Sequence, residues 1–290
     1  VDELWAYSRY SADMLSRWSP VPVVTVPLPV LVPDQDTTDG LDFGRDFVFL
    51  FTFDFFSTMQ RKNPMGLVDA FIRAFAPGEG PRLVLKAMNG SFRPEAADAL
   101  RWKIGERGDI ELVDRHVAPG AYGALLARSD CYVSLHRAEG FGLTMAESMA
   151  LGKPVIATGY SGNLDFMTTS NSYLVDYELT NVGPDAEHYP SDGTWAEPNL
   201  DHAAKLMREV WEQRDRAANR GERAARDMRE RFSPELVGRI ARSRLELVAG
   251  SLAKGGGRRH APSAELLELG EIEQSLTAEQ SRFTYGVATV

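Results

Sequence analysis

The sequence predicts an α/β fold built on a doubly wound parallel sheet, and two observations support this prediction. Short apolar runs of strand length alternate with segments of helical periodicity from residue 46 to about residue 248. The apolar runs are nearly continuous, as in parallel strands that are covered on both faces. Ligands bind such sheets at the carboxyl ends of the strands, so we expect the chemistry in the loops after the strands.

The individual elements follow from local signals along the chain. Residues 1–19 are predicted as a short helix ended by Pro20, and residues 21–33 as an extended connector, because proline lacks the N–H and fixes φ. A helix is predicted to begin after Asn63, a favourable N-cap, with Pro64 at its first position. Loops are expected over 34–44 and 181–198. The full prediction comprises strands over 47–53, 82–88, 109–113, 131–135, 154–158 and 173–175, and helices over 63–75, 95–104, 122–127, 143–151, 200–214, 216–230 and 233–248.

Composition and charge narrow the class of protein. Hydrophobic residues make up 43% of the 290 residues, enough for a sizeable core without disulfides or metals as supports. Cys131 is the only cysteine, which excludes an internal disulfide and favours a reducing compartment, so we expect a cytoplasmic protein. The net charge of −9 argues against a nucleic-acid partner but leaves a local basic pocket open. No apolar run approaches the ~20 residues of a membrane span, and peripheral membrane association stays open as an alternative.

The two ends of the chain differ from its middle. The chain begins at Val1 and not at a methionine, and the regular pattern starts only at Asp46, so we expect a fragment of a longer protein. We predict three parts, covering residues 1–45, 46–250 and 251–290. Glycines at 255–257 and the two arginines after them indicate a flexible linker, and residues 264–281 form a candidate amphipathic helix.

The most informative segment runs from a predicted strand through a glycine loop into a predicted helix, over residues 134–155. Gly140 and Gly142 let the backbone turn tightly and approach a ligand, and the N–H groups that open the helix suit a phosphate. Glu139 precedes the loop and Glu147 lies eight residues later, so both carboxylates can face one pocket. Two alternatives remain open: Thr144 and Glu147 have the spacing of a capping box, and Glu139 has the setting of a solvated loop carboxylate.

The stretch from Glu139 to Glu147, Glu-Gly-Phe-Gly-Leu-Thr-Met-Ala-Glu, resembles the E-x7-E motif of the retaining glycosyltransferases of family 4, which have the GT-B fold. Residues 61–64, 150–158 and 162–165 are similar to other stretches of the same family, and the resemblance covers about residues 46–248. It implies that 46–250 form a Rossmann-like domain that binds a nucleotide sugar. It also implies that 1–45 are the connector and the end of an acceptor-binding N-terminal domain, most of which is missing.

The resemblance implies the transfer of a hexose from a nucleotide-diphosphate sugar to an acceptor hydroxyl with retention of configuration. It implies no metal and no cofactor beyond this co-substrate. Glu139 is then expected to contact the sugar hydroxyls, Glu147 to hold the ribose hydroxyls, and Lys62 to offset the charge of the leaving diphosphate. Backbone N–H groups for the donor are expected from Gly140, Phe141, Gly142 and Leu143. The other candidate contacts are Thr144, Arg61, Lys86, His136 and, near the base, His116 and Val117.

Some of these candidates have a plain structural alternative. The family often has an arginine after the first strand, but residues 53–57 contain none, so Arg61 is a candidate substitute, or a solvated residue at a helix start. Lys86 either reaches the phosphates or extends into solvent at the edge of the sheet. His136 is either a donor contact or a structural hydrogen-bonding residue.

Two other functions remain as alternatives. The chain alone is expected to be inactive because the acceptor half is absent, and it then acts as a module that binds nucleotide sugars without turnover. A GT-B nucleotide-sugar epimerase is the second alternative. The nucleotide base, the sugar and the acceptor, whether glycan, lipid or small molecule, are left open by the sequence.

Overall fold

The computed structural model describes residues 1–35, 44 and 46–253. Most of the predicted loop over 34–44, and the candidate helix over 264–281 with nearly all of the part predicted as 251–290, lie outside the described residues. The chain divides into two compact units, residues 1–237 and 238–290. The first unit contains the sheet and the candidate site.

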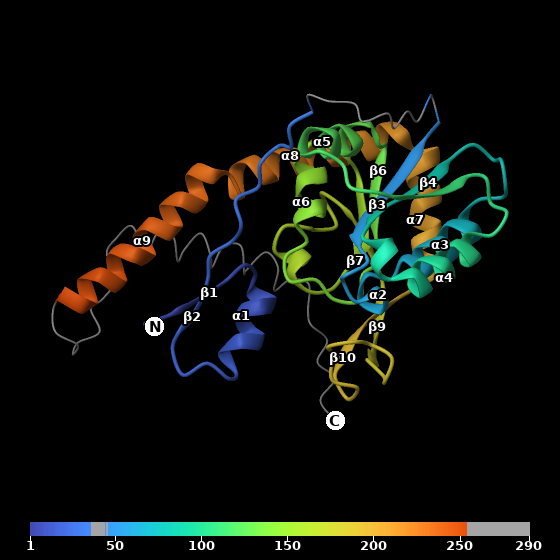
Figure 1. Ribbon diagram of the computed structural model, residues 1–290. Helices are drawn as coiled ribbons and strands as arrows, with labels where there is room; N and C mark the ends of the chain where they lie inside the picture. The colour runs from blue at the N-terminus through green and yellow to red at the C-terminus, as the bar shows by residue number, and fades with distance from the viewer. Residues whose placement is uncertain (36–43, 45, 254–290) are drawn as a thin grey trace. The chain divides into compact units, whose positions relative to one another are not determined.

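A six-stranded parallel sheet organises the first unit (Figure 1). The strand order is β5-β4-β3-β6-β7-β8, and every neighbouring pair is parallel. The strands are β3 (Val48–Asp54), β4 (Arg82–Met88), β5 (Ile110–Asp114), β6 (Cys131–Ser134), β7 (Val155–Thr158) and β8 (Tyr173–Val175). The chain starts in the middle at β3, runs outward to β5, returns beside β3 as β6, and runs outward again to β8. This order confirms the predicted doubly wound α/β fold and puts the switch point between β3 and β6.

Helices cover both faces of the sheet (Figure 1). On one face α3 packs against α4 and α7, and on the other α6 packs against α8, beside α5. Their bounds are α3 (Pro64–Ala74), α4 (Pro94–Ile104), α5 (Pro119–Arg128), α6 (Leu143–Ala150), α7 (Leu200–Glu212) and α8 (Arg214–Arg231). Two short 3-10 helices, η1 (Gly90–Phe92) and η2 (Gly162–Asp165), follow β4 and β7. The second unit begins within α9 (Pro234–Ala253), and α7 to α9 form the predicted helical C-terminal region.

Between these helical layers the central parts of the strands are buried. Phe49, Leu50, Leu85, Val133 and Ile156 are fully buried, which explains why their runs are almost continuously apolar. Cys131 lies at the start of β6 and is also fully buried.

Asn63 caps α3 as predicted. Its side chain accepts a hydrogen bond from the backbone N–H of Gly66 at 3.1 Å, and Pro64 takes the first helical position. Asn63 itself has φ of 54°, in the left-handed region, where asparagine is tolerated better than most residues. Its amide donates to the carbonyl of Leu135 at 3.0 Å, so the cap also joins the start of α3 to the loop after β6.

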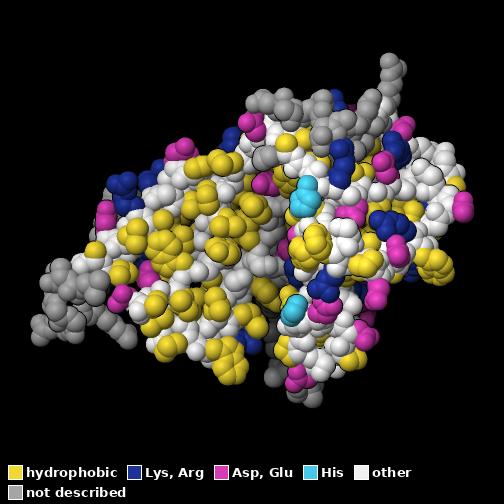
Figure 2. All heavy atoms as spheres, in the orientation of Figure 1, with side chains coloured by type: hydrophobic (Ala, Val, Ile, Leu, Met, Phe, Trp, Pro, Cys, Tyr) yellow, Lys and Arg dark blue, Asp and Glu magenta, His cyan; other side chains and the backbone are white. Residues whose placement is uncertain are grey.

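The predicted helix over residues 1–19 is wrong in its first part. Leu4–Ala6 form strand β1, which pairs in parallel with β2 (Val23–Thr25), and α1 (Arg9–Ser16) is the crossover between them. Ser8 separates strand from helix because its extended backbone and its hydroxyl, which accepts from the Ser11 N–H, form an N-cap. Figure 2 shows hydrophobic side chains gathered over β1, α1 and β2. The exposed ones in this segment include Tyr7, Met14, Leu15 and Trp18.

The predicted loop over 181–198 is also wrong in part. Strand β10 (Thr194–Pro198) pairs with β9 (Tyr177–Asn181) as an antiparallel hairpin. Trp195 and Ala196 are buried, so β10 is anchored in the fold. The sequence predicts a loop here because polar residues are frequent between the two strands and the apolar runs within the strands are short.

Among the described residues, no helix is both long enough and apolar enough to span a membrane.

Gly221 shows how tightly α8 packs on the turn after α6. A Cβ at Gly221 would overlap the carbonyl oxygen of Gly152, whereas a Cβ at Gly238 would meet nothing within 4 Å. Glycine to alanine in a helix normally stabilises by about 1 kcal/mol. We therefore expect Gly238→Ala to raise the melting temperature and Gly221→Ala to lower it, in matched thermal unfolding experiments. A rise with Gly221→Ala would contradict this close packing.

Candidate functional site

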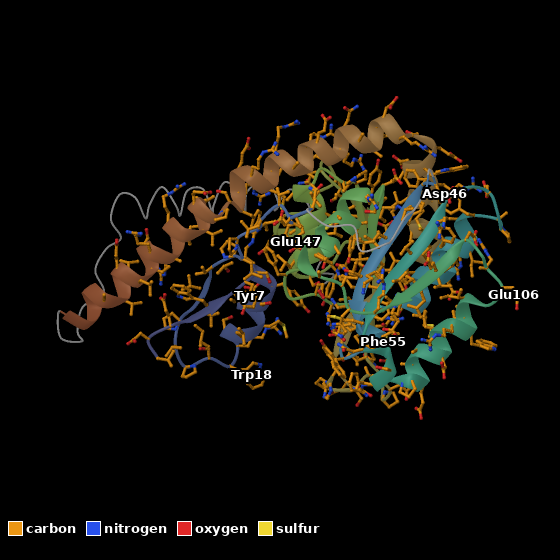
Figure 3. The ribbon with its side chains drawn as sticks, turned by 45° about the horizontal axis from the view of Figure 1, so that its top comes forward. Tyr7, Trp18, Asp46, Phe55, Glu106 and Glu147 are labelled. Atoms are coloured by element: carbon orange, nitrogen blue, oxygen red, sulfur yellow. The ribbon has the colours of Figure 1, made fainter. Side chains whose placement is uncertain are left out.

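The candidate site lies at the carboxyl ends of β3 and β6, where the strand order reverses. Figure 3 labels Asp46 and Phe55 at the two ends of β3, and the site lies at the Phe55 end. After β3 the chain forms α2 (Met59–Lys62), and after β6 it forms the loop over residues 135–142. The adjacency of β3 and β6 therefore brings α2 to the glycine loop.

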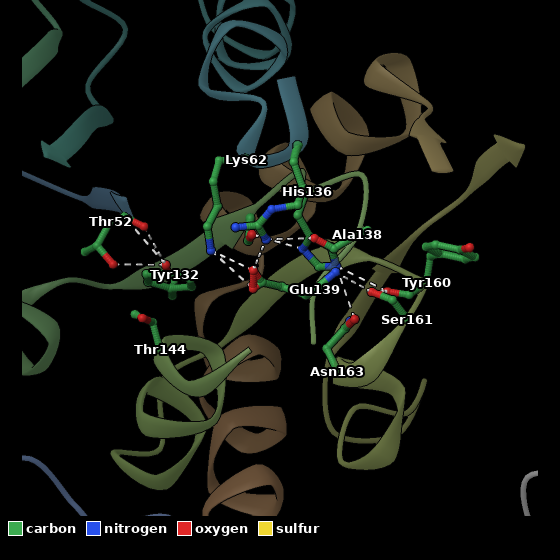
Figure 4. Close-up of polar contacts among 12 residues, drawn as sticks. Thr52, Lys62, Tyr132, His136, Ala138, Glu139, Thr144, Tyr160, Ser161 and Asn163 are labelled. Atoms are coloured by element: carbon green, nitrogen blue, oxygen red, sulfur yellow. Dashed lines mark hydrogen bonds and ion pairs between the residues drawn. The ribbon is translucent and has the colours of Figure 1, made fainter. Parts of the chain in front are cut away.

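Three of the predicted residues form one ion-pair cluster (Figure 4). The Oε1 atom of Glu139 accepts from Nη1 of Arg61 and from Nζ of Lys62, each at 2.6 Å. The side chain of Glu139 is only 11% exposed. The alternatives in which Glu139 and Arg61 are solvated are therefore wrong.

The cluster keeps Glu139 ionised. Burial by itself would raise the pKa of the Glu139 carboxyl, but the charges of Lys62 and Arg61 outweigh burial and hold this pKa at about 2. Two cations face one carboxylate, so the cluster carries a net positive charge that suits an anion.

The segment after β7 holds the backbone at the start of the glycine loop through hydrogen bonds. Ser161 accepts from the N–H of Glu139 at 2.8 Å, and the N–H of Gly162 donates to the carbonyl of Glu139 at 2.9 Å. Gly142 has φ of 92°, a conformation that favours glycine. The side chain of Phe141 is buried against Phe166, so only its backbone is available to a ligand. Leu143, the first residue of α6, has an exposed side chain.

The capping box, which was the structural alternative for Thr144 and Glu147, does not form at the start of α6. Gly142 is the N-cap, and no side chain caps the helix there. Instead, the hydroxyl of Tyr122 contacts Oε2 of Glu147 at 2.9 Å and Oγ1 of Thr144 at 3.2 Å. Burial raises the pKa of the Glu147 carboxyl, while the hydrogen bond from Tyr122 opposes this rise.

His136 is completely buried beside the loop (Figure 4). Its Nδ1 lies 3.0 Å from the Ser134 hydroxyl, and its Nε2 lies 3.2 Å from the Tyr160 carbonyl and 3.1 Å from Oδ1 of Asn163. Burial lowers the pKa of the His136 ring, which favours the neutral form. Since protein groups engage both ring nitrogens, the arrangement fits the structural alternative.

Lys86 does not lie at an edge of the sheet, because β4 has β5 and β3 on its two sides. The side chain is buried, and Nζ donates to the carbonyls of Ala87, at 2.6 Å, and Arg115. Lys86 therefore supports the loop after β5. In that loop His116 is exposed and contacts Oδ1 of Asn89 at 3.0 Å, with Val117 next to it.

Sequence reasoning missed two residues at the site, Tyr122 and Arg137. Tyr122 lies on α5 and reaches Glu147 only because α5 and α6 share a face of the sheet. Arg137 bonds to Glu197, 60 positions away in the unpredicted hairpin. Neither contact has a local spacing that a sequence pattern would reveal.

The fold and the site together define a doubly wound α/β protein with a positively charged ion-pair cluster at its switch point. Residues 115–227 match the family model of the glycosyl transferases group 1. This part of the chain is therefore similar to a glycosyl transferases group 1 domain, and the fold is of the GT-B type. No match was found among curated proteins.

Solved structures agree on the fold. Sucrose-phosphate synthase from Thermosynechococcus elongatus matches with a TM-score of 0.65 and 18% identity, over 87% of this chain and 59% of that one. Anabaena HepE in complex with UDP and glucose matches with a TM-score of 0.65 and 16% identity, over 85% and 63%. A glycosyltransferase from Rickettsia africae matches with a TM-score of 0.63 and 16% identity, over 88% and 64%. The chain spans about three fifths of the length of these proteins.

We expect Glu139→Gln to lower the free energy of unfolding by about 3 kcal/mol at pH 7, because a carboxyl pKa lowered from 4.5 to about 2 corresponds to that much stabilisation. The lowered pKa means that the stabilisation is complete above pH 4.5 and is lost as the pH falls toward 2. Denaturant unfolding of both proteins between pH 7 and pH 3 should show the difference shrinking to about two fifths of its value at pH 7.

Glu106→Gln is the matched control for that series, since Glu106 is an exposed carboxylate in the turn after α4. Its difference from the parent protein should stay near zero throughout. A constant deficit for Glu139→Gln down to pH 3 would show that the carboxylate is not coupled to the cations.

Proposed function

We propose that this chain is the donor-binding part of a retaining hexosyltransferase of family 4. The proposed reaction transfers a hexose from a nucleotide-diphosphate sugar to an acceptor hydroxyl with retention of configuration. The cluster of Glu139, Arg61 and Lys62 beside the glycine loop carries this proposal. The complex of HepE with UDP-glucose, a protein with the same fold, gives further support.

In the proposed site the two cations of α2 receive the diphosphate. Arg61 and Lys62 lie together at the carboxyl end of β3 and face the loop after β6. Their charge offsets the negative charge that develops on the leaving diphosphate, the largest electrostatic requirement of such a transfer. The proposal therefore needs no metal and no cofactor beyond the donor.

In the proposed site the two carboxylates accept hydrogen bonds from the hydroxyl groups of the donor. Glu139 stays ionised and accepts from hydroxyls of the sugar, while the N–H groups of Phe141, Gly142 and Leu143 face the sugar and the diphosphate. Tyr122 occupies Oε2 of Glu147, so Oε1 is the oxygen proposed for the ribose hydroxyls, with Thr144 beside it. His116 and Val117 flank the base. Lys86 and His136 are assigned to the support of the site, because protein groups already engage their polar atoms.

The rest of the enzyme lies outside the described site. We propose that an N-terminal domain of the same protein binds the acceptor and that this chain alone is inactive. Its single cysteine and its donor class favour the cytoplasm.

Donor binding is testable on the chain itself with UDP, GDP and ADP and with their hexose conjugates. At ~100 times its dissociation constant, a ligand stabilises by about 2.7 kcal/mol, which raises the melting temperature by roughly 5–10 °C for a protein of this size. We expect such a rise with one base only, and its loss in Glu147→Ala. Asp98→Ala, at an exposed carboxylate on α4, should keep it. If no nucleotide stabilises the chain, the proposed donor site is wrong.

Turnover separates the proposal from its two alternatives. The full-length protein should release the nucleoside diphosphate from its donor only when a suitable acceptor is added from a panel of glycans, lipids and small molecules. Lys62→Met should slow this release by about 100-fold, because it removes a charge that stabilises the leaving group. Release without any acceptor would indicate the epimerase, and binding without release would indicate the binding module.

A further inference from the structure

Helix α2 carries both cations but has little support of its own. It has four residues, Met59–Lys62, and its N-cap residue Thr58 makes no side-chain capping bond. A helix this short is unstable alone, and its last carbonyl groups have no partners within the helix. A hollow of about 290 Å³ borders α2, lined by Met59, Gln60 and Met65, together with α4 residues.

Arg137 supplies the missing partners at the C-terminal end of α2. Its backbone N–H donates to the carbonyl of Arg61 at 2.8 Å. Its guanidinium Nη1 donates to the carbonyl of Gln60 at 2.5 Å. A cation at this end of a helix also interacts favourably with the helix dipole.

The β9–β10 hairpin fixes the guanidinium in this position. Glu197 of β10 accepts from Nε of Arg137 at 2.6 Å and from Nη2 at 2.9 Å, in a bidentate pair. The ring of Trp195 lies 5.3 Å from the guanidinium carbon, and the N–H of Ala196 donates to the Arg137 carbonyl at 3.0 Å. Arg137 is thus held from the hairpin on one side and holds α2 on the other.

A second contact joins the hairpin connection to the same region. The carbonyl of Glu187 accepts from the Thr58 hydroxyl at 3.1 Å, and the Glu187 carboxylate pairs with both terminal nitrogens of Arg93 at 3.1 Å. The hairpin therefore contacts α2 at its N-cap through Thr58 and at its last turn through Arg137.

We propose that Arg137 is a positioning residue that clamps α2 to the β9–β10 hairpin and thereby sets where Arg61 and Lys62 meet a diphosphate. This inference rests on the proposed function. On this proposal the hairpin affects binding of the diphosphate and not of the nucleoside. The reason is that it acts through α2, whose proposed contacts with the donor are the cations Arg61 and Lys62. Lysine cannot replace Arg137, since one ammonium group cannot bind two carboxylate oxygens and a carbonyl in the same plane.

The test combines two measurements on the chain, with UDP and UMP as probes. Hydrogen exchange of the α2 amides should accelerate in Arg137→Lys, and also in Glu197→Gln, where the bidentate pair is lost. The affinity for UDP should fall by about tenfold in Arg137→Lys, while the affinity for UMP changes less than twofold. A general loss of structure would lower both affinities alike, so their ratio identifies positioning.

Arg73→Lys is the matched control, because Arg73 pairs with Asp201 on the exposed surface of α3 and α7. It should change neither measurement. Unchanged exchange in α2, or equal losses for UDP and UMP, would overturn the proposal. If the parent chain binds neither UDP nor UMP, GDP with GMP and ADP with AMP replace them. Failure with all three pairs contradicts the donor site, while the exchange measurement still decides whether Arg137 holds α2.

Discussion

Two adjacent cations on a four-residue helix repel each other, and the carboxylate of Glu139 is what holds them in one place. The three charged groups are largely buried, and a buried charge is costly unless it is paired. Two further contacts fix the elements that carry these charges. Asn63 fixes the helix junction to the loop after β6, and Ser161 fixes the backbone of Glu139.

The strand order explains why this cluster forms where it does. Lys62 and Glu139 are 77 positions apart, and they meet because β3 and β6 are neighbours although their crossovers run to opposite sides. The same reversal of strand order leaves room for a ligand at the carboxyl ends of β3 and β6. The ion pair with Glu139 also means that a bound anion has to share both cations with a carboxylate of the protein, or to displace it.

Much of this arrangement was predictable from local sequence. The strands over 82–88 and 173–175 were predicted at their observed bounds, and the Asn63 cap has the geometry that its sequence signal indicates. The glycine loop and its two glutamates lie within nine consecutive residues, so their proximity needs no tertiary knowledge. The meeting of Lys62 with Glu139 required the strand order, and it was expected only through a family resemblance.

The failures of prediction have physical causes. Strand β1 was assigned to a helix because only Tyr7 and Ser8 separate it from α1. Strand β9 of the hairpin was missed because it is mostly exposed and carries polar residues, unlike the buried apolar strands of the sheet. The position of Lys86 was misjudged because a single strand sequence does not tell whether neighbours flank it on both sides. For His136 the structural alternative was open from the sequence, but its partners Tyr160 and Asn163 lie in a distant segment that local sequence does not specify.

The burial of Cys131 has a practical consequence for labelling the protein. Its thiol is enclosed in the core, and burial raises its pKa well above the ordinary value, so it stays protonated and unreactive. It is also the chain's one cysteine. A cysteine introduced on the surface, for example in the connection between β9 and β10, would be the sole thiol available to a maleimide dye. A fluorophore or spin label can therefore be attached at a chosen point without first removing a native residue.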